Sequence, residues 1–378
     1  MTIFREIIGG GFEQVAFCHD AESGLRAIVA IHNTAAGPSL GGCRYMTYAD
    51  EEVALQDAMR LARGMTYKNA AYNLPYGGGK AVVWRDPAAR MEECGPEATR
   101  AQRRAGRSGT GELRGEEYGR RRLFQSLGRF IEGLGGRYIT GLDLGTCIQD
   151  MDAIQTQTSY VTDTSGSIMA QDDFTAEMTA YGVYQGMKAA VGYRLGLPSL
   201  YDLKVLVQGL GKVGFRLCRY LYEDGARLIV SDLNDSAVLE AVRYYGARRV
   251  KPENVYKTKC DVFAPCALGG ILNDVTIPRL RCSIVAGAAN NQLSMERHGE
   301  LIEEKGILYV PDYILNAGGI IITAGELQGL GREELQESVQ AVAETAKEVF
   351  HLAEKFGIPP SKAAKRLAEQ NLERLKKR

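Results

Sequence analysis

The chain has 378 residues, a length at which two domains with separate cores are expected rather than one. Its 46 basic and 46 acidic side chains cancel and no long charged tail is present, which excludes the electrostatic footprint of a nucleic-acid-binding protein. No stretch reaches the roughly 18 apolar residues of a membrane span, and charges near the start interrupt the apolar run that a signal peptide needs. We therefore expect a cytoplasmic protein that acts on a small molecule and binds neither nucleic acid nor a membrane.

Cysteine and histidine give no sign of a metal site. The eight cysteines are scattered without a Cys-x-x-Cys pair, and the four histidines lie far apart. The Gly-x-Ser-x-Gly elbow of many Ser-His-Asp hydrolases is also missing. We expect no bound metal and a reducing compartment.

The first third of the chain predicts a hairpin, a helix and a short strand. Two β-rich runs, 13–20 and 25–32, flank a four-residue turn and predict a hairpin whose edge a second subunit could cover, so a homo-oligomer is expected. Apolar residues at helical spacing predict a helix over 51–65, with Lys68 directly after it. A short strand is expected at 81–84, immediately after Lys80.

The segment 88–122 departs from any regular pattern. It holds nine arginines, six glutamates and six glycines and almost no apolar periodicity, which predicts an irregular, solvated loop. An arginine patch for an anionic partner is the less favoured interpretation, because acids interleave with the arginines. An oddity of the reading frame is a third possibility.

Regular periodicity resumes at 123–131 with a helix, followed by a strand that ends at Asp143. A polar loop at 164–174 leads into a helix over 175–195, which we expect to cross between domains. Strands at 204–208, 227–231, 261–265, 283–286 and 307–310 then alternate with helical stretches, which predicts a doubly wound parallel sheet. The region 332–377 is predicted to be helical with a break at 357–360.

A glycine-rich turn follows the strand at 204–208 and opens a helix. The motif is Gly209-Leu210-Gly211-Lys212-Val213-Gly214, and Asp232 lies 21 residues after Gly211 at the end of the next strand. In this context the pattern predicts dinucleotide binding, with the pyrophosphate at the helix N-terminus and the carboxylate on the ribose. A carboxylate would repel a 2′-phosphate, so NAD is favoured over NADP.

Two lysines stand in an otherwise uncharged stretch. Lys80 follows three consecutive glycines, which allow close backbone approach, and Lys68 lies in an uncharged run from Met65 to Gly79. Taken singly, each could be an ordinary surface lysine. In one apolar cleft, however, they would depress each other's pKa, so that one could bind a carboxylate while the other acts as a base. Asp143 could relay a proton, or could be only a turn residue.

Several blocks together resemble the leucine/phenylalanine dehydrogenase branch of the Glu/Leu/Phe/Val amino-acid dehydrogenase family. They are Gly37-Pro38-Ser39-Leu40-Gly41-Gly42-Cys43-Arg44, Gly64 to Lys68, Gly77 to Lys80, Tyr138 to Asp143, Gly209 to Gly214, Phe263 to Leu268, Gly287 to Leu293 and Pro311 to Gly319. The resemblance covers nearly the whole chain, and 88–122 is longer than expected for it. It implies a two-domain α/β fold with a cleft that must close to exclude water. We expect a substrate and oligomerisation domain at 1–162, a Rossmann-like NAD-binding domain at 163–340, and helices at 341–378 that pack back on the first domain.

The resemblance also implies NAD-dependent, reversible oxidative deamination of an apolar L-amino acid to a 2-oxo acid and ammonia. Lys68 would bind the substrate carboxylate with Gly41 and Gly42, Lys80 would be the general base, and Asp143 would take the amine-side proton. The cofactor would contact Gly209, Leu210, Gly211, Lys212, Val213, Gly214, Asp232, Leu233, Thr179, Cys266, Ala267, Ala289, Asn290 and Asn291, and Asn291 would also reach the substrate.

The substrate side chain would meet Leu40, Gly141, Ile320 and Thr323. Glycine at 141 leaves room and favours phenylalanine, with leucine or another branched-chain amino acid next. Tryptophan or broad specificity stays open, because Thr323 brings a hydroxyl to a position that is usually apolar. Two further alternatives are a non-catalytic NAD-binding protein and a first domain whose folding the segment 88–122 impairs.

Overall fold

The computed structural model describes residues 3–85 and 112–376, and the side chains from residue 118 onward in the second of these ranges. The chain divides into two compact units, residues 1–171 with 374–378 and residues 172–373. The predicted boundaries at 162/163 and 340/341 stay predictions, as does the predicted packing of the last helices on the first domain. Among the helices of the described residues, none is both long and apolar enough to cross a lipid bilayer.

The first unit is built on a mixed sheet with strand order β1-β2-β5-β3-β6, and β4 also pairs with β5. Its strands are β1 (Gln14–Asp20), β2 (Leu25–Asn33), β3 (Ser39–Leu40), β4 (Cys43–Met46), β5 (Gly77–Trp84) and β6 (Tyr138–Ile139). The predicted hairpin is confirmed, because β1 and β2 pair antiparallel from Gln14↔Ile31 to Asp20↔Leu25. Strand β5 begins four residues earlier than predicted, so the three glycines before Lys80 lie inside the sheet.

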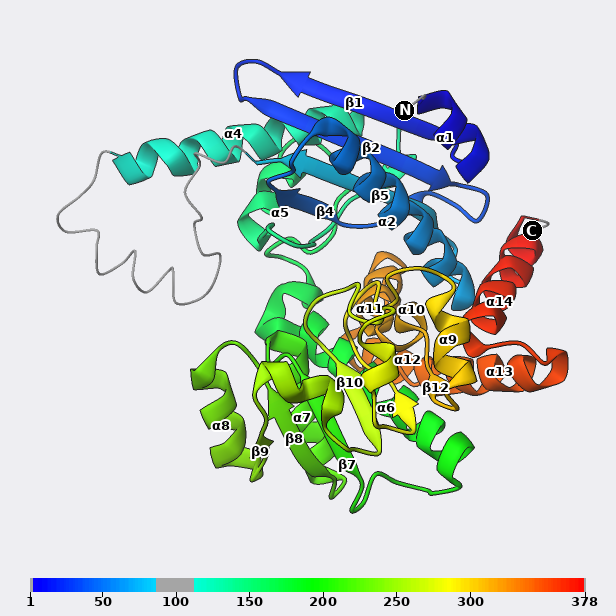
Figure 1. Cartoon of the computed structure of the whole chain (residues 1–378). Coiled ribbons are helices and arrows are strands. Elements are labelled where there is room, and N and C mark those ends of the chain that lie inside the picture. Colours follow the sequence, from blue (N-terminus) through cyan, green and yellow to red (C-terminus); the bar gives the residue numbers. More distant parts are fainter. Residues whose placement is uncertain (1–2, 86–111, 377–378) are drawn as a thin grey trace. The chain divides into compact units, whose positions relative to one another are not determined.

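Helix α2 (Glu51–Ala71) covers one face of this sheet, as Figure 1 shows, and the short helix α1 (Ile3–Gly10) precedes β1. Asp50 caps α2 by accepting a hydrogen bond from the Val53 amide, and two glutamates follow in the first turn. The buried face of α2 packs on Ile28, Ala30 and Val82. The helix continues six residues beyond the predicted end at Met65, so Lys68 lies in its last turn rather than after it.

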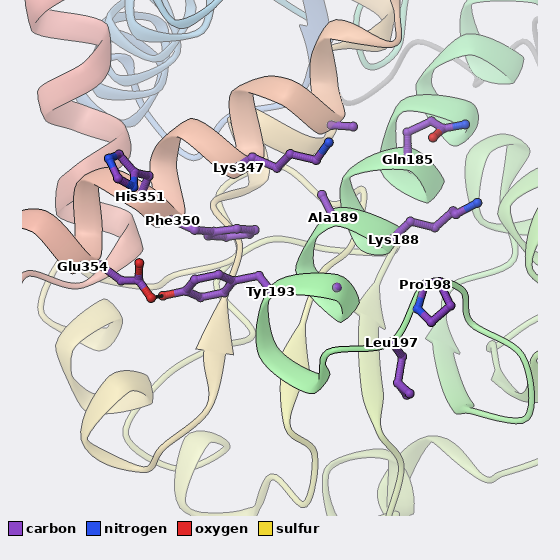
Figure 2. Close-up of a pocket in the computed structure, with 12 residues that line it drawn as sticks. Gln185, Lys188, Ala189, Tyr193, Leu197, Pro198, Lys347, Phe350, His351 and Glu354 are labelled. Atoms are coloured by element: carbon purple, nitrogen blue, oxygen red, sulfur yellow. Dashed lines mark hydrogen bonds between the residues drawn. The ribbon is translucent and has the colours of Figure 1, made fainter.

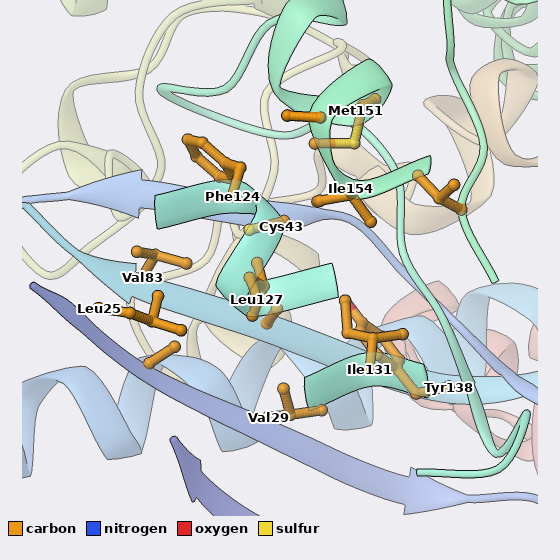
Figure 3. Close-up of a cluster of buried hydrophobic side chains, with 14 of the residues drawn as sticks. Leu25, Val29, Cys43, Val83, Phe124, Leu127, Ile131, Tyr138, Met151 and Ile154 are labelled. Carbon is orange, nitrogen blue, oxygen red and sulfur yellow. The ribbon is translucent and has the colours of Figure 1, made fainter. Parts of the chain in front are cut away.

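Helices α4 (Glu112–Glu132) and α5 (Ile148–Gln155) cover the other face. Figure 3 shows Leu25, Val29 and Val83 pointing from the strands toward Phe124 and Leu127 of α4. Because residues on a strand alternate between faces, the side chains next to these, including Lys80 and Val82, face α2 instead. This alternation decides on which side of the sheet the candidate site lies.

The loop predicted for 88–122 is wrong over its last eleven residues, which form the first turns of α4. Residues 88–111 lie outside the described part of the chain. A tertiary contact holds Arg120, two turns into α4: its guanidinium binds both oxygens of Asp150 at 2.7 and 2.8 Å and stacks over the Tyr45 ring. This tertiary anchor overrides the weak helix propensity of a glycine-rich stretch.

The second unit has a fully parallel sheet with strand order β12-β11-β10-β7-β8-β9. The strands are β7 (Lys204–Gln208), β8 (Arg227–Ser231), β9 (Arg248–Arg249), β10 (Val262–Pro265), β11 (Ile284–Val285) and β12 (Leu308–Tyr309). In chain order this is 6-5-4-1-2-3, the strand order of a Rossmann fold. The predicted doubly wound parallel sheet is therefore confirmed. The order reverses between β7 and β10, where such folds bind their ligands.

The remaining elements are helices and short 3₁₀ segments. They are η1 (Ile168–Asp173, which spans the division), α6 (Phe174–Leu195), α7 (Lys212–Glu223), α8 (Asp235–Tyr245), η2 (Pro252–Lys257), η3 (Ile277–Arg279), α9 (His298–Glu304), α10 (Asp312–Leu315), α11 (Gly318–Leu327), α12 (Arg332–Ser338), α13 (Ala341–Phe356) and α14 (Pro360–Leu375). Helix α6 confirms the predicted helix at 175–195, although it belongs to the second unit rather than crossing between the two. The predicted break at 357–360 is confirmed, because α13 ends at Gly357, a left-handed C-cap.

Candidate active site

Three glycines let helix α2 and the neighbouring strands approach strand β5 closely. A methyl group on Gly77 would overlap the carbonyl oxygen of Asn33, and one on Gly78 would overlap the amide of Thr66 in α2. One on Gly79 would lie 2.7 Å from the Tyr138 ring. Lys80 follows directly, and its side chain is only 6% exposed.

Two further glycines bring the neighbouring strands against this point. A methyl group on Gly41 would overlap the Gly79 carbonyl oxygen, and one on Gly42 would overlap the Leu142 carbonyl oxygen and come within 3.0 Å of the Asp143 Cβ. The Tyr138 hydroxyl donates hydrogen bonds to the carbonyls of Gly41 and Gly42 at 2.7 and 3.2 Å. The structure thus brings Leu40, Gly41, Gly42, Lys80, Gly141 and Asp143 together in the first unit.

Lys80 and Asp143 form the centre of this cluster. The Lys80 Nζ lies 2.8 Å from Asp143 Oδ2, and the Arg44 Nε lies 2.9 Å from the same oxygen. Arg44 also binds Asp57 Oδ2 through its NH1 at 3.0 Å. Four largely buried charges of alternating sign therefore run from β5 to α2.

The electrostatics of the cluster keep Asp143 ionised. Burial alone raises the pKa of this carboxyl, but the positive charges of Lys80 and Arg44 outweigh burial and hold its pKa below the ordinary range. Burial lowers the pKa of Arg44, and the carboxylates of Asp143 and Asp57 more than compensate and raise it. Asp143 is thus an anion in direct contact with the Lys80 amine.

Lys68 is half-buried in the last turn of α2. Thr66, two residues before Lys68, packs against Gly78, two residues before Lys80. The two lysines therefore lie on elements that are in direct contact. Their predicted roles and their mutual effect on pKa stay predictions.

Gly141 does not leave free space in the direction of its missing side chain. A methyl group there would overlap the Asp163 carboxylate and the Thr162 hydroxyl. Asp163 is buried at a positive φ of 60° and accepts a hydrogen bond from the Leu142 amide at 2.8 Å. This carboxylate holds the segment after β6 that carries Asp143, and it fills the space that was predicted for a substrate side chain. The predicted strand that ends at Asp143 is wrong at its end, because β6 stops at Ile139.

In the second unit, the glycine-rich turn lies at the switch point of the sheet. Gly209 has a φ of +100°, and a methyl group on it would lie 2.7 Å from the Ala267 amide after β10. A methyl group on Gly214 would overlap the Gly209 carbonyl oxygen, which explains the third glycine. Gly211, by contrast, has no atom of the described residues within 4 Å of the position that a Cβ would take. It is the N-cap of α7, and no side chain caps the first amides of this helix. The first-turn amides of Lys212, Val213 and Gly214 are thus suited to a phosphate.

Asp232 joins the second strand to this turn. Its carboxylate accepts hydrogen bonds from the amides of Leu210 at 2.5 Å and Asn234 at 2.7 Å. Leu233 follows with its side chain 88% exposed. The carboxylate is thus fixed where a ribose is expected and retains lone pairs for hydroxyl groups.

Most of the other predicted cofactor residues follow strands β10 and β11. Cys266 and Ala267 pack against Gly209. The Ala289 amide donates to the Pro265 carbonyl at 2.9 Å, Asn290 Oδ1 accepts from Asn316 at 2.7 Å, and Asn291 has a φ of +52°. These residues therefore share the carboxyl-terminal edge of the sheet with the glycine-rich turn.

The remaining predicted residues lie on α6 and α11. Thr179 of α6 would lie 3.2 Å from a methyl group on Gly319, so the two helices touch there. Ile320 is half-buried and Thr323 is buried on α11. The Thr323 hydroxyl donates to the Gly319 carbonyl at 2.9 Å, so it is satisfied within its own helix.

A separate pocket of about 540 Å³ lies between α6 and α13 in the second unit. Figure 2 shows the stacked rings of Tyr193 and Phe350, with Lys188, Lys347 and Glu354 around them. None of the predicted site residues lines this pocket. It is therefore not the candidate active site.

Arg44, Asp57 and Tyr48 are site residues that the sequence did not single out. Tyr48 donates to Asp57 Oδ2 at 2.8 Å, and Arg60 binds Asp57 Oδ1 at 2.8 Å. Arg44 stood within the motif at 37–44 but received no role. The sequence feature that could have identified Arg44 as a site residue is its position two residues after Gly42.

Comparisons with known proteins agree with this geometry. Residues 12–114 match a family model described as "Glu/Leu/Phe/Val dehydrogenase, dimerisation domain", and residues 232–378 match one described as "Glutamate/Leucine/Phenylalanine/Valine dehydrogenase". A leucine dehydrogenase of Thermoactinomyces intermedius is 46% identical over 377 residues, which cover 100% of this chain and 95% of that protein. A valine dehydrogenase of Streptomyces albus is 39% identical over 371 residues, or 96% and 93% of the two chains.

The crystal structure of L-tryptophan dehydrogenase from Nostoc punctiforme superposes with a TM-score of 0.80 at 40% identity and covers 100% of both chains. The predicted two-domain α/β fold is confirmed. The chain belongs to the glutamate/leucine/phenylalanine/valine dehydrogenase family, and it is an amino-acid dehydrogenase by the full-length similarity to its relatives.

Proposed function

We propose that the protein catalyses the NAD-dependent, reversible oxidative deamination of an apolar L-amino acid to the 2-oxo acid and ammonia. The observation that carries the proposal is the contact of 2.8 Å between Lys80 Nζ and Asp143 Oδ2. A buried amine and carboxylate beside two closely packed glycines provide a proton donor and acceptor where a small substrate can approach the backbone.

Each residue of the first unit has a separate role in this proposal. Lys68 and the backbone around Gly41 and Gly42 bind the substrate carboxylate. Asp143 accepts the proton from the amine side. Lys80 is the general base that activates water for attack on the imino carbon, and it returns the proton in the reverse direction.

The glycine-rich turn and Asp232 would hold NAD, which would supply the hydride acceptor for the oxidation at the α-carbon of the substrate. The residues of the second unit fit this cofactor, because Gly211 faces open space and the first turn of α7 has no side-chain cap. Asp232 would bind the ribose hydroxyls and repel a 2′-phosphate, which favours NAD over NADP. Asn291 would contact both the cofactor and the substrate.

Among apolar amino acids, we propose leucine and other branched-chain substrates first. Two similar proteins are named leucine dehydrogenase and valine dehydrogenase. The preference for phenylalanine depended on room at Gly141, and the Asp163 carboxylate occupies that direction. Because the Thr323 hydroxyl is bonded within its own helix, the methyl group of this threonine is the part that would meet an apolar substrate side chain. Phenylalanine and tryptophan form the second group to test.

The decisive experiment is NADH formation at alkaline pH with leucine, valine, phenylalanine and tryptophan, each repeated with NADP. We expect turnover with NAD and at least one branched-chain substrate. Folded protein that binds NAD but turns over none of the four would overturn the proposal in favour of a non-catalytic NAD-binding protein.

Lys80→Ala tests the assigned base. We expect kcat to fall at least about 100-fold while NAD affinity stays unchanged, because general-base catalysis is typically worth a factor of that size. Lys68→Ala should raise KM for the amino acid more than it lowers kcat. Lys259→Ala, at an exposed position of the second unit, serves as the control.

We also propose that the protein forms a homo-oligomer through its first unit. The matching family model is described as a dimerisation domain. Strand β1 lies at the end of the strand order and exposes Phe17 to 54%, so its outer edge is open among the described residues. Light scattering should give a mass that is a multiple of the chain mass, and Phe17→Asp should reduce it.

A further inference from the structure

Arg44 on strand β4 links two buried carboxylates. Its Nε donates to Asp143 Oδ2 at 2.9 Å and its NH1 donates to Asp57 Oδ2 at 3.0 Å. The side chains of Arg44 and Asp57 are each only 13% exposed. Arg44 is therefore largely buried and binds the same carboxylate as Lys80. The arginine of an ordinary surface ion pair is neither buried nor linked to such a group.

The described contacts of the Asp143 carboxylate all fall on one oxygen. Lys80 and Arg44 both bind Oδ2, and Oδ1 receives no hydrogen bond from any residue within 3–85 or 112–376. With Oδ2 held from two directions, rotation of the carboxylate is restricted. Oδ1 is then left in a fixed direction.

We propose that Arg44, anchored by Asp57, is a positioning residue for the deamination: it holds Asp143 Oδ2 against Lys80 and so directs Oδ1 to the amine of the substrate. This inference rests on the proposed function. Arg44 itself does not touch the substrate, and it acts through Asp143.

The geometry requires arginine rather than lysine. Nε and NH1 are two donors of one rigid planar group, so the guanidinium fixes the two carboxylates relative to each other. Asp57 is itself fixed by the Tyr48 hydroxyl, which donates to its Oδ2 at 2.8 Å. A lysine would keep the positive charge but could not hold both carboxylates in this geometry.

Three other titratable groups around Asp143 are neutral. Burial is the first cause that raises the pKa values of Cys43, Tyr48 and Tyr138, so each stays protonated at neutral pH. The cations that bind the Asp143 carboxylate within the described residues are Lys80 and Arg44, and Arg44 also binds the Asp57 carboxylate. The Asp163 carboxylate lies near the same segment, where it binds the Leu142 amide. Removing the charge of Arg44 should raise the pKa of Asp143 toward its ordinary value.

The test compares Arg44→Gln, Arg44→Lys and Arg60→Gln. Arg44→Gln should lower kcat by about 10- to 100-fold with a smaller change in KM, the range expected when a catalytic group is misplaced by about 1 Å. The acidic limb of the kcat/KM profile should move to higher pH, since Asp143 must be ionised to accept a proton. Arg44→Lys should keep the pH profile near that of the wild type and still lose kcat.

Arg60→Gln is the matched control, because Arg60 binds the same Asp57 but is 51% exposed and does not contact Asp143. Its kcat and pH profile should stay within about twofold of the wild type. If Arg44→Gln folds poorly, Asp57→Asn removes the anchor with little change in volume, and it should lower kcat in the same direction. An Arg44→Gln enzyme with the kcat and pH profile of Arg60→Gln would overturn the proposal.

A crystal structure of Arg44→Gln gives a readout that does not depend on turnover. We expect the Asp143 carboxylate to rotate away from its position beside Lys80. An unmoved carboxylate would overturn the positioning role. If the wild type turns over no amino acid, the proposed function fails, and the position of this carboxylate still decides whether Arg44 holds it.

Discussion

Helix α2 and strand β5 pack so closely that a single methyl group between them should be costly. Gly78→Ala would place its Cβ onto the amide and hydroxyl of Thr66 and the carbonyl of Ala62, all in the helix that carries Lys68. Two of these three atoms belong to the backbone, so a side-chain rotation cannot relieve the overlap. Normal van der Waals contact requires the helix to move by about 1 Å.

A displacement of this size sets the expected magnitudes. Overpacking of a well-packed core costs about 1–3 kcal/mol, and each kcal/mol lowers Tm by about 2–4 °C for a domain of this size. The first unit should therefore unfold about 2–12 °C earlier, which thermal unfolding followed by circular dichroism would show. Turnover should fall about 100-fold as well, because Lys68 moves relative to Lys80.

Gly64→Ala provides the control in the same helix. Nothing lies within 4 Å of a methyl group at this exposed position, so alanine should stabilise the helix by up to about 1 kcal/mol. A Gly78→Ala protein as stable and active as Gly64→Ala would show that α2 does not press on β5 as described. Loss of turnover without loss of stability would contradict the overpacking argument as well.

Four further substitutions test other parts of the chain, one of them as a control. Arg120→Gln should destabilise the first unit by about 3–5 kcal/mol in a denaturant titration, because it leaves the buried Asp150 carboxylate unpaired. Arg122→Gln, in an exposed pair of the same helix, should cost less than about 1 kcal/mol. Hydrogen bonds from two serines lower the pKa of Asp20 from 3.8 to about 2, so its stabilising effect is present above pH 3.8 and is lost as the pH falls through about 2. The difference in Tm between wild type and Asp20→Asn should shrink over that window. Gly211→Ala should keep the Tm of the wild type and lose NAD affinity at least about tenfold by calorimetry, since the structure leaves open space there.

Five of the six strands of the second unit could be predicted from the sequence, and only β9, a two-residue strand of arginines with no apolar pattern, was missed. The features of this unit are local patterns: short apolar strands, the glycine-rich turn and a carboxylate at the end of the next strand. Each of these patterns predicts one structural feature of a parallel sheet. The helix break at Gly357 is local in the same way. What the sequence could not give was the set of contacts at the carboxyl-terminal edge, such as the packing of Ala267 on Gly209.

The first unit was harder, because its decisive contacts join residues far apart in the chain. In helix α4, for example, Arg120 binds Asp150, which lies thirty residues later in the chain. Asp57 and Arg60 have the spacing of an ordinary exposed helix pair, so nothing in the sequence indicates that Asp57 is buried against Arg44. Burial of a charged side chain follows from its partner, and the partner was not identifiable.

The glycines show where such reasoning fails. The sequence shows where a Cβ is missing, but it does not show in which direction that Cβ would have pointed or which neighbouring atoms it would have met. At Gly42 the direction leads to Asp143, which agrees with a close approach of the chain to the site. At Gly141, only two residues before Asp143, it leads to the Asp163 carboxylate, which consumes the space and fixes the Leu142 amide. The space at this glycine is therefore taken by the Asp163 carboxylate rather than left for a substrate side chain. Differences in amino-acid preference should then be sought at Leu40, Ile320 and Thr323 rather than at Gly141.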